Sequence, residues 1–420
     1  MIENVLSREN MLSALARVEA NKGSHGVDGM SVKTLRGHLV QNWQTIRESI
    51  RNGTYEPSPV RRVEIPKPNG GTRLLGIPTV TDRLIQQAIT QVLTPVFDPA
   101  FSEHSYGFRP QRRGHDAVRK ARAFMREGYR IVVDIDLEKF FDRVHHDRLM
   151  ANLAERVADQ ALLKLIRSYL QSGVMVKGLV QATEEGTPQG GPLSPLLSNI
   201  VLDELDKELE KRNLPFVRYA DDCNIYVKTW KAGYRVMGSL TSFIEKKLKL
   251  KVNQAKSAVA RPWKRKFLGF TLSWDKKNPK VKIAEASLQR VKAKIRAITS
   301  RSSAVSMEMR IKGLNQYLTG WCGYYALVDT RHVFQELDEW TRRRLRMCVW
   351  KQWKVPKTKV KKLVALGIPK QKAYEWGNSR KKYWRIARSP ILHRALNNQH
   401  WISMGLRSLT DRYNLLRNRP

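Results

Sequence analysis

The four residues Tyr219-Ala220-Asp221-Asp222 are the part of the chain best suited to chemistry. They lie between two short apolar runs, 214–218 and 224–227, a pattern that predicts two strands joined by a tight turn. Two adjacent carboxylates on a rigid turn repel each other unless a cation neutralises them. Asp is also a common turn residue, so a solvated hairpin is the alternative for this tetrapeptide taken alone.

A second acidic strand lies upstream, at 131–137, and carries Asp134 and Asp136. One carboxylate from this strand and the two from the hairpin would form the ligand set that paired Mg²⁺ ions need for phosphoryl transfer, with Mn²⁺ as a possible substitute. The residues alone leave open which of the two aspartates takes part. Together the two segments predict a nucleotidyl-transfer site.

Three other segments carry groups that suit a nucleoside triphosphate. Lys67 and Arg73 flank a glycine-rich turn, where both cations could hold phosphates. Gln189, in a Pro- and Gly-rich loop, could hydrogen-bond a sugar or base, and Lys256 could donate a proton to leaving pyrophosphate. A basic surface turn, a plain loop before a helix and a surface lysine are the respective alternatives.

The charge of the chain is extreme. It contains 77 Lys and Arg against 38 Asp and Glu, a net charge of +39 with an isoelectric point near 10.4. Such self-repulsion is best tolerated when the working partner is a polyanion, which favours nucleic acid over an acidic membrane surface. No apolar run is long enough to span a membrane, and the start lacks the pattern of a signal peptide. The three cysteines show no metal-ligand spacing and fit a reducing compartment.

Periodicity predicts a mixture of helices and strands around the acidic cluster, which indicates an α+β catalytic domain. Phe267–Phe270 is expected to be a buried strand, and His145 to Asp147 the start of a helix rather than a metal site. Helices are predicted within 10–50, at 82–92, 145–173 and 195–212, a hairpin at 60–78, and strand, hairpin and helix over 214–270.

The remainder, 285–420, is helix-forming and very basic, with 30 Lys and Arg against eight Asp and Glu, a net charge of +22. Seven of the eleven tryptophans also lie there. We expect the tryptophans to pack inward and the interleaved cations to follow phosphates. A boundary near 355 would separate a helical bundle from a last basic module. The candidate contacts are Arg342, Arg343, Arg344, Arg346, Lys351 and Lys354.

The order of the segments makes a specific pattern. The chain resembles group II intron-encoded reverse transcriptases, which also act as maturases, and most closely the compact bacterial group IIC type. The resemblance covers nearly the whole chain. It rests on Gly26-Val27-Asp28-Gly29, Glu64-Ile65-Pro66-Lys67-Pro68, His104-Ser105-Tyr106-Gly107-Phe108-Arg109-Pro110, Asp136–Phe141, Thr187–Pro195, Tyr219–Asp222 and Phe267–Phe270.

The resemblance implies a right-hand polymerase. Residues 1–283 would form the fingers and palm, 284–355 a helical thumb or maturase domain, and 356–420 a basic DNA-binding module. The endonuclease domain of many relatives is expected to be missing after Pro420.

The resemblance also assigns roles to single residues. In the family the first catalytic aspartate lies five residues before an aromatic sugar gate, which selects Asp136 with Phe141 and leaves Asp134 for strand support or a salt bridge. Phe141 would exclude a ribose 2′-hydroxyl, so the product would be DNA. The remaining implied sites are Asp221, Asp222 and the Leu137 carbonyl for the metals, Lys67, Arg73, Gln189, Lys256 and Ala220 for the incoming nucleotide, and Arg109 for nucleic acid.

The implied partners are a group II intron RNA, an RNA template with a DNA or RNA primer, target DNA and dNTPs, with no membrane. The implied location is the bacterial cytoplasm, in association with the nucleoid. Two alternatives stay open: a splicing cofactor with a vestigial polymerase site, and a retron or CRISPR-associated reverse transcriptase. The Asn-Ala-x-x-His and Val-Thr-Gly elements usual in retron enzymes do not occur in the sequence.

Overall fold

The computed structural model describes residues 1–66, 70–176, 179–181, 185–186, 190–275 and 277–418. The chain divides into two compact units, unit 1 with residues 1–265 and unit 2 with residues 266–420. The domain boundaries predicted after residues 283 and 355 stay predictions. No helix in the described ranges is both long and apolar enough to cross a bilayer.

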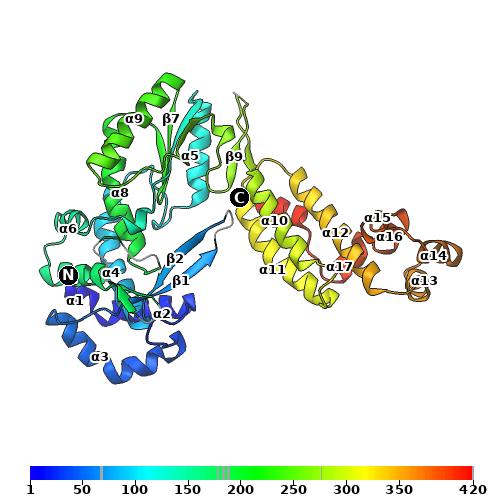
Figure 1. The fold of residues 1–420 in the computed structure, drawn as a ribbon, viewed down its shortest axis with the longest axis horizontal. Helices are drawn as coiled ribbons and strands as arrows, with labels where there is room; N and C mark the ends of the chain where they lie inside the picture. Colours follow the sequence, from blue (N-terminus) through cyan, green and yellow to red (C-terminus); the bar gives the residue numbers. More distant parts are fainter. Residues whose placement is uncertain (67–69, 177–178, 182–184, 187–189, 276, 419–420) are drawn as a thin grey trace. The chain divides into compact units, whose positions relative to one another are not determined.

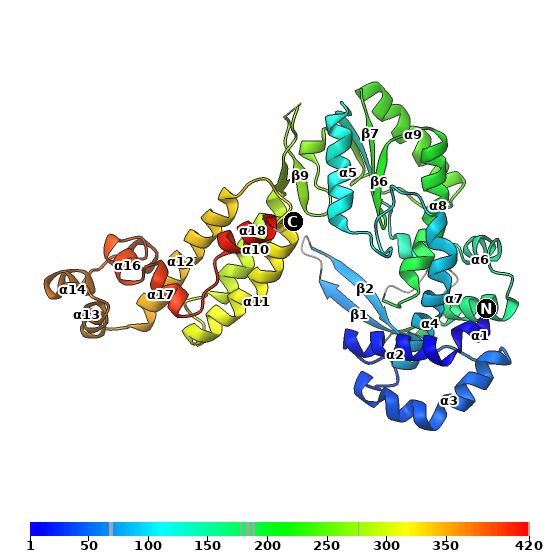
Figure 2. The same cartoon turned by 180° about the vertical axis from the view of Figure 1, so that it is seen from behind.

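Unit 1 combines helices with two four-stranded sheets (Figures 1 and 2). Its α-helices are α1 (Ile2–Val5), α2 (Arg8–Asn21), α3 (Leu35–Arg51), α4 (Val80–Phe97), α5 (Gly114–Arg126), α6 (His146–Ala154), α7 (Gln160–Gln171), α8 (Ser194–Lys211) and α9 (Trp230–Lys246). Its strands are β1 (Val60–Pro66), β2 (Thr72–Ile77), β3 (Ile131–Ile135), β4 (Val174–Val176), β5 (Leu179–Gln181), β6 (Phe216–Tyr219), β7 (Asp222–Val227) and β8 (Ala258–Ala260). Short 3₁₀ helices are η1 (Val32–Thr34), η2 (Asp98–Ala100), η3 (Phe140–Asp142) and η4 (Pro262–Lys264).

The first sheet has the order β2-β1-β4-β5. β1 and β2 form the antiparallel hairpin that the sequence predicts for 60–78. β1 also pairs in parallel with β4, so that Val60 lies opposite Val174. The adjoining helix α4 is buried mainly in its first half, and the Thr79 hydroxyl caps its start by accepting a hydrogen bond from the Asp82 N–H.

The second sheet has the order β6-β7-β3-β8, with every pair antiparallel. Alternate residues of β3 and β7, such as Val133 and Ile225, are buried in the main core because successive side chains of a strand face opposite sides. Helix α9 packs against β3, and α5 packs beside β6 (Figures 1 and 2). This sheet carries both acidic segments that the sequence singled out.

Unit 2 consists of a two-stranded sheet and helices. The predicted strand Phe267–Phe270 is wrong for its first three residues, because Leu268 (φ 51°) and Gly269 (φ 81°) are left-handed and make a tight turn. The strand begins only at Phe270. The elements are β9 (Phe270–Leu272), β10 (Val281–Ile283), α10 (Glu285–Ile298), α11 (Met307–Tyr325), α12 (His332–Gln352), α13 (Pro356–Ala365), α14 (Lys370–Gly377), α15 (Tyr383–Ile386), α16 (Pro390–Ala395), α17 (Asn398–Ser403) and α18 (Leu409–Arg417).

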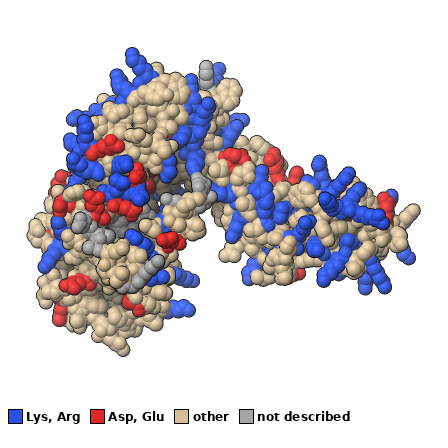
Figure 3. Space-filling model, in the orientation of Figure 1, with Lys and Arg blue, Asp and Glu red and all other residues tan. Residues whose placement is uncertain are grey.

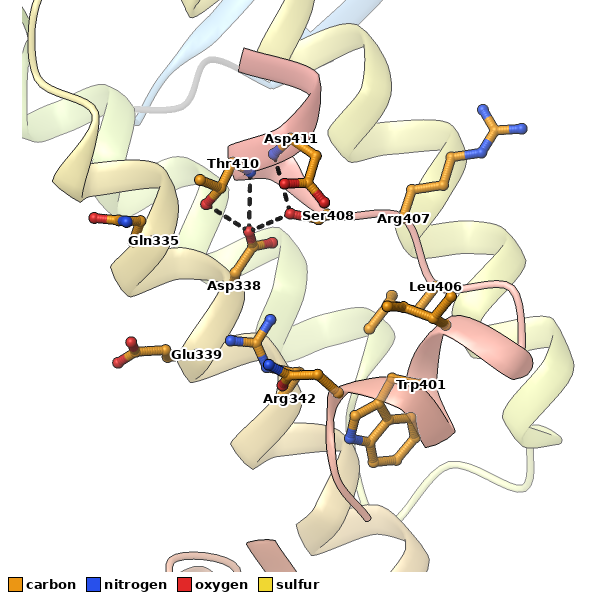
Figure 4. Close-up of a pocket in the computed structure, with 12 residues that line it drawn as sticks. Gln335, Asp338, Glu339, Arg342, Trp401, Leu406, Arg407, Ser408, Thr410 and Asp411 are labelled. Atoms are coloured by element: carbon orange, nitrogen blue, oxygen red, sulfur yellow. Dashed lines mark hydrogen bonds between the residues drawn. The ribbon is translucent and has the colours of Figure 1, made fainter. Parts of the chain in front are cut away.

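The last helix of unit 2 packs back onto the longest one. Asp338 of α12 accepts hydrogen bonds from the Ser408 hydroxyl (3.0 Å), the Leu409 N–H (2.9 Å) and the Thr410 N–H (2.9 Å), as Figure 4 shows in part. A carboxylate at a helix start satisfies N–H groups that have no partner inside the helix. Residues beyond 355 are therefore joined to α12 by buried polar contacts.

Candidate active site

The hairpin tip between β6 and β7 is short and tightly held. Tyr219 pairs with Asp222, so only Ala220 and Asp221 form the turn. Ala220 is buried and left-handed, with φ of 56°, a conformation that costs a residue with a side chain about 1 kcal/mol or more. Such a conformation persists only when the surrounding structure enforces it.

Asp136 follows β3 and is fixed by the turn that precedes β8. Its N–H donates to the Ser257 hydroxyl at 3.0 Å, and its carbonyl accepts from the Asn253 N–H at 2.8 Å. The Lys256 ammonium lies 3.6 Å from its carboxylate oxygen Oδ1. The structure therefore brings two of the predicted site residues, Asp136 and Lys256, together.

The charges of Asp136, Lys256 and Arg73 act on the Asp221 carboxylate. Burial raises its pKa, and the negative charge of Asp136 raises it further, whereas Arg73 and Lys256 lower it. Residues from the β1–β2 hairpin, β3, the β6–β7 tip and the turn before β8 thus converge on one place. A bound cation would relieve the repulsion between the two carboxylates.

Asp136, Asp221 and Asp222 are the carboxylates predicted to hold the metal ions. Among the residues that the structure describes, no three His, Cys, Asp or Glu side chains are arranged as a ready metal cluster. Asp136 and Asp221 supply the hard oxygen donors that Mg²⁺ prefers, so the residues present fit such an ion. Asp222 is exposed at the start of β7, and its role and that of the Leu137 carbonyl stay predictions.

Several other predicted residues can be placed. Asp134 forms an ion pair with Arg265 (2.6 Å), the supporting use expected for it. Phe141 lies half-buried in η3, with its ring centroid 5.2 Å from that of Phe140. Lys67 and Gln189 lie outside the described residues.

Sequence reasoning missed a buried polar network under the hairpin. Arg218 on β6 and Asp206 on α8 are both fully buried and form an ion pair. Arg218 also donates to the Ala220 carbonyl (3.0 Å), the Asn199 side chain (3.0 Å) and the Ser105 hydroxyl (2.7 Å). A direct hydrogen bond therefore holds the left-handed Ala220. The available signal was an arginine inside an otherwise apolar strand, since a buried charge requires a partner.

The loop around Gly107 closes over the same network. The Gly107 carbonyl accepts from the Asn199 side chain at 2.9 Å. A Cβ at Gly107 would lie 2.2 Å from the backbone nitrogen of Ala220, so only glycine allows this approach. The His104–Pro110 element thus supports the hairpin from the outside.

One of the predicted nucleic-acid contacts, Arg109, needs correction. Arg109 is buried, and its guanidinium binds the Asp98 carboxylate (2.7 Å) and the Ser102 carbonyl (2.6 Å), so it stabilises a loop and cannot lie on a nucleic acid. Arg346 is largely buried but lines a cavity of unit 2, and the Arg344 guanidinium donates to the Thr299 hydroxyl at 2.6 Å, so the contacts predicted for both stay predictions. Lys351 and Lys354 are exposed, and their contacts stay predictions.

Two protein families match the chain. Residues 65–272 match reverse transcriptases (RNA-dependent DNA polymerases), and residues 288–365 match the maturase-specific domain of group II introns. The first match contains Asp136, Asp221 and Asp222, and the second contains all of α12.

Single proteins agree with these matches. Protein YkfC of Escherichia coli is 33% identical over 61% of this chain and 78% of its own length. The group II intron-encoded protein LtrA of Lactococcus lactis is 38% identical over 49% of this chain, but the chain spans only 34% of LtrA. A solved telomerase from Candida albicans aligns with 90% of this chain and 68% of its own at 13% identity, with a TM-score of 0.44, which is too weak a likeness for argument.

The two family matches, together with the relatives, also establish the enzyme class and the right-hand polymerase fold. The chain belongs to the group II intron-encoded reverse transcriptases and maturases, and it is by class an RNA-directed DNA polymerase.

Proposed function

We propose that the chain extends a primer 3′-hydroxyl with dNTPs on an RNA template by two-metal nucleotidyl transfer. We propose further that it binds its group II intron RNA to assist splicing and mobility of the intron, with target DNA as a further partner. One observation carries the polymerase proposal: Asp221 is held on a buried, hydrogen-bonded turn within electrostatic reach of Asp136, Arg73 and Lys256. An unused carboxylate pair of this kind would only destabilise the fold.

Asp136, Asp221 and Asp222, with the Leu137 carbonyl, would hold the Mg²⁺ ions, for which Mn²⁺ could substitute. When bound, such ions lower the pKa of the attacking hydroxyl and neutralise the charge that develops on the leaving phosphates. The positive charges of Arg73 and Lys256 both lower the pKa of Asp221. Arg73 would bind the triphosphate, and Lys256 would protonate pyrophosphate.

Three groups would act on other parts of the nucleotide and its site. Lys67 would assist Arg73 at the phosphates, and Gln189 would contact the sugar or base. Phe141 would exclude a 2′-hydroxyl by steric contact, and the backbone at Ala220 would border the incoming nucleotide. The half-buried position of Phe141 beside Phe140 leaves it little freedom to move aside.

Primer extension tests the proposal. The Asp221→Asn variant keeps the size of the side chain and removes its charge, and we expect extension with Mg²⁺ to fall by roughly 10³-fold or more. Lys207→Ala is the control, because the Lys207 side chain is exposed and its ion-pair partner is Asp203, which is not a residue of the site. Equal extension by Asp221→Asn and the wild type would refute the assignment of the site.

The maturase-specific match supports a second activity that can be separated from the first. If unit 2 binds the intron RNA, the Asp221→Asn variant should still promote splicing of the flanking intron RNA. A protein that promotes splicing while even the wild type fails to extend primers would be a splicing cofactor alone.

A further inference from the structure

A cavity of about 610 Å³ in unit 2 is lined by an unusual number of arginines. Arg342, Arg343 and Arg346 reach it from α12. Arg388 and His393 reach it from the segment that contains α15 and α16. The site is therefore built from two parts of the sequence that would otherwise be assigned to separate modules.

Two of the arginines are held in fixed positions. The Arg343 guanidinium lies 3.8 Å from the ring centroid of Trp384 and donates to the Trp384 carbonyl at 3.1 Å. Arg346 donates through Nε to the Ala387 carbonyl (3.0 Å), and its Nη2 lies 3.1 Å from Nε2 of His393. Fixing a guanidinium before binding reduces the entropy that a ligand must overcome.

Positive charge exceeds negative charge in the lining of this cavity. Burial, together with the positive charges of Arg342 and Arg343, lowers the pKa of Arg346 to about 10. Burial also lowers the pKa of His393, and the charged neighbours that add to this effect are four arginines. Among the described residues, none of these arginines forms an ion pair with a carboxylate. The lining also contains two glutamates, Glu336 and Glu339, but its four arginines outnumber them, so its net charge is positive. Desolvated like charges of this kind favour a bound anion.

We propose that this cavity binds neighbouring phosphate groups of a nucleic-acid backbone, held jointly by α12 and by the 384–393 segment. Guanidinium groups bind phosphate oxygens in pairs, and stacked Trp384 is a positioning residue for Arg343. Lys and Arg side chains continue over the surrounding helices, which suits an extended polyanion rather than a small one (Figure 3). The inference rests on the proposed function in taking nucleic acid as the ligand.

The first test compares two exposed arginines that lie three residues apart. Arg388 lines the cavity, and Arg385 does not. Binding of RNA and DNA hairpins of one unrelated sequence is measured across a salt series. We expect Arg388→Ala to weaken binding about 3- to 10-fold and to reduce the salt slope by about one, whereas Arg385→Ala changes both much less. Equal losses in the two variants would show diffuse attraction and overturn the site.

The second test removes no charge. Trp384→Ala should weaken binding of the same hairpins nearly as much as Arg343→Ala, and Trp384→Phe, which keeps an aromatic face, should restore most of the loss. The double variant Trp384→Ala/Arg343→Ala should be no weaker than Arg343→Ala, because both changes disable one contact. Additive losses would contradict the positioning role, and circular dichroism checks that each variant is folded.

A hairpin with methylphosphonate linkages identifies the ligand chemistry. We expect it to bind wild type and Arg388→Ala alike, because the backbone charge is gone. RNA and DNA hairpins that respond equally to Arg388→Ala indicate phosphate alone, and a response confined to RNA indicates an RNA backbone. None of these measurements requires polymerase turnover. A failure of the phosphate-binding proposal is therefore distinguishable from a failure of the polymerase proposal, which would appear as primer extension by Asp221→Asn.

Discussion

Arg218 and Asp206 form a two-point ion pair beside the Tyr219–Asp222 turn, with Nε donating to Oδ1 at 2.7 Å and Nη2 donating to Oδ2 at 2.5 Å. Both side chains are fully buried. Removing one partner from such a pair leaves an uncompensated charge in the core. We expect Asp206→Ala to destabilise unit 1 by about 3–5 kcal/mol, measured by urea unfolding. Lys207→Ala, on the next residue and exposed, should cost less than about 1 kcal/mol.

Replacing both partners separates stability from positioning. The double variant Arg218→Met/Asp206→Leu buries no charge and should regain most of the stability lost by Asp206→Ala. Its primer extension should stay impaired, because the Ala220 carbonyl has lost its Arg218 donor. Recovery of full extension along with stability would mean that the network does not position the turn.

Gly107→Ala should disturb the active site without adding or removing charge. The new methyl group would lie 2.2 Å from the Ala220 nitrogen. The atoms that it meets belong to the backbone of Tyr219 and Ala220, which has little room to adjust. We expect a loss of about 1–3 kcal/mol together with a marked loss of extension. Gly238→Ala in α9 is the matched control, because a Cβ there meets no neighbouring atom, and it should be neutral or slightly stabilising.

Phe141→Ala should relax sugar selection. If the Phe141 ring blocks the ribose 2′-hydroxyl, its removal should raise the ratio of ribonucleotide to deoxyribonucleotide incorporation by about 10-fold or more. The measurement is single-nucleotide extension with rATP or dATP opposite the same template base. Phe140→Leu, in the buried neighbour, should lower stability and leave the ratio unchanged.

Glu204 should make the stability of unit 1 depend on acid pH. Burial raises its pKa, but hydrogen bonds from Arg148 and Asn152 outweigh burial, so the pKa lies below the ordinary 4.5. Its stabilisation is therefore complete above that value and is lost as the pH falls through the lowered pKa. We expect Glu204→Gln to cost about 1 kcal/mol near neutral pH and almost nothing in strong acid, measured by urea unfolding. Glu245→Gln, at an exposed position, should have the stability of the wild type both near neutral pH and in strong acid.

Local pattern predicted the elements well, because hairpins such as β6–β7 and helices such as α4 carry period-two or helical apolar patterns. The prediction of a strand over Phe267–Phe270 was wrong because apolar residues on both sides of a glycine suit a turn as well as a strand.

At the site, the Tyr219–Asp222 segment pointed to Asp221, and the family resemblance selected Asp136. The structure brings the charge of Asp136 within electrostatic reach of Asp221. The sequence could not reveal that Arg109 is paired with Asp98 or that Arg218 is paired with Asp206, because burial depends on which segments meet in space. The same holds for Arg388 and Arg343, which share a cavity although α13 and α14 separate them in sequence.

The acidic strand β3 is an interior strand, with Val133 opposite Ile225 of β7 on one side and opposite Val259 of β8 on the other. β8 begins at Ala258, which is 123 residues beyond the end of β3 at Ile135. During synthesis this neighbouring strand therefore becomes available only long after β3 has left the ribosome. Until then one edge of β3 offers unpaired backbone groups to any passing strand. We therefore expect a nascent chain to become active as a polymerase only after β8 has been synthesised. A chain truncated before Ala258 is expected to aggregate rather than to act as a weak enzyme.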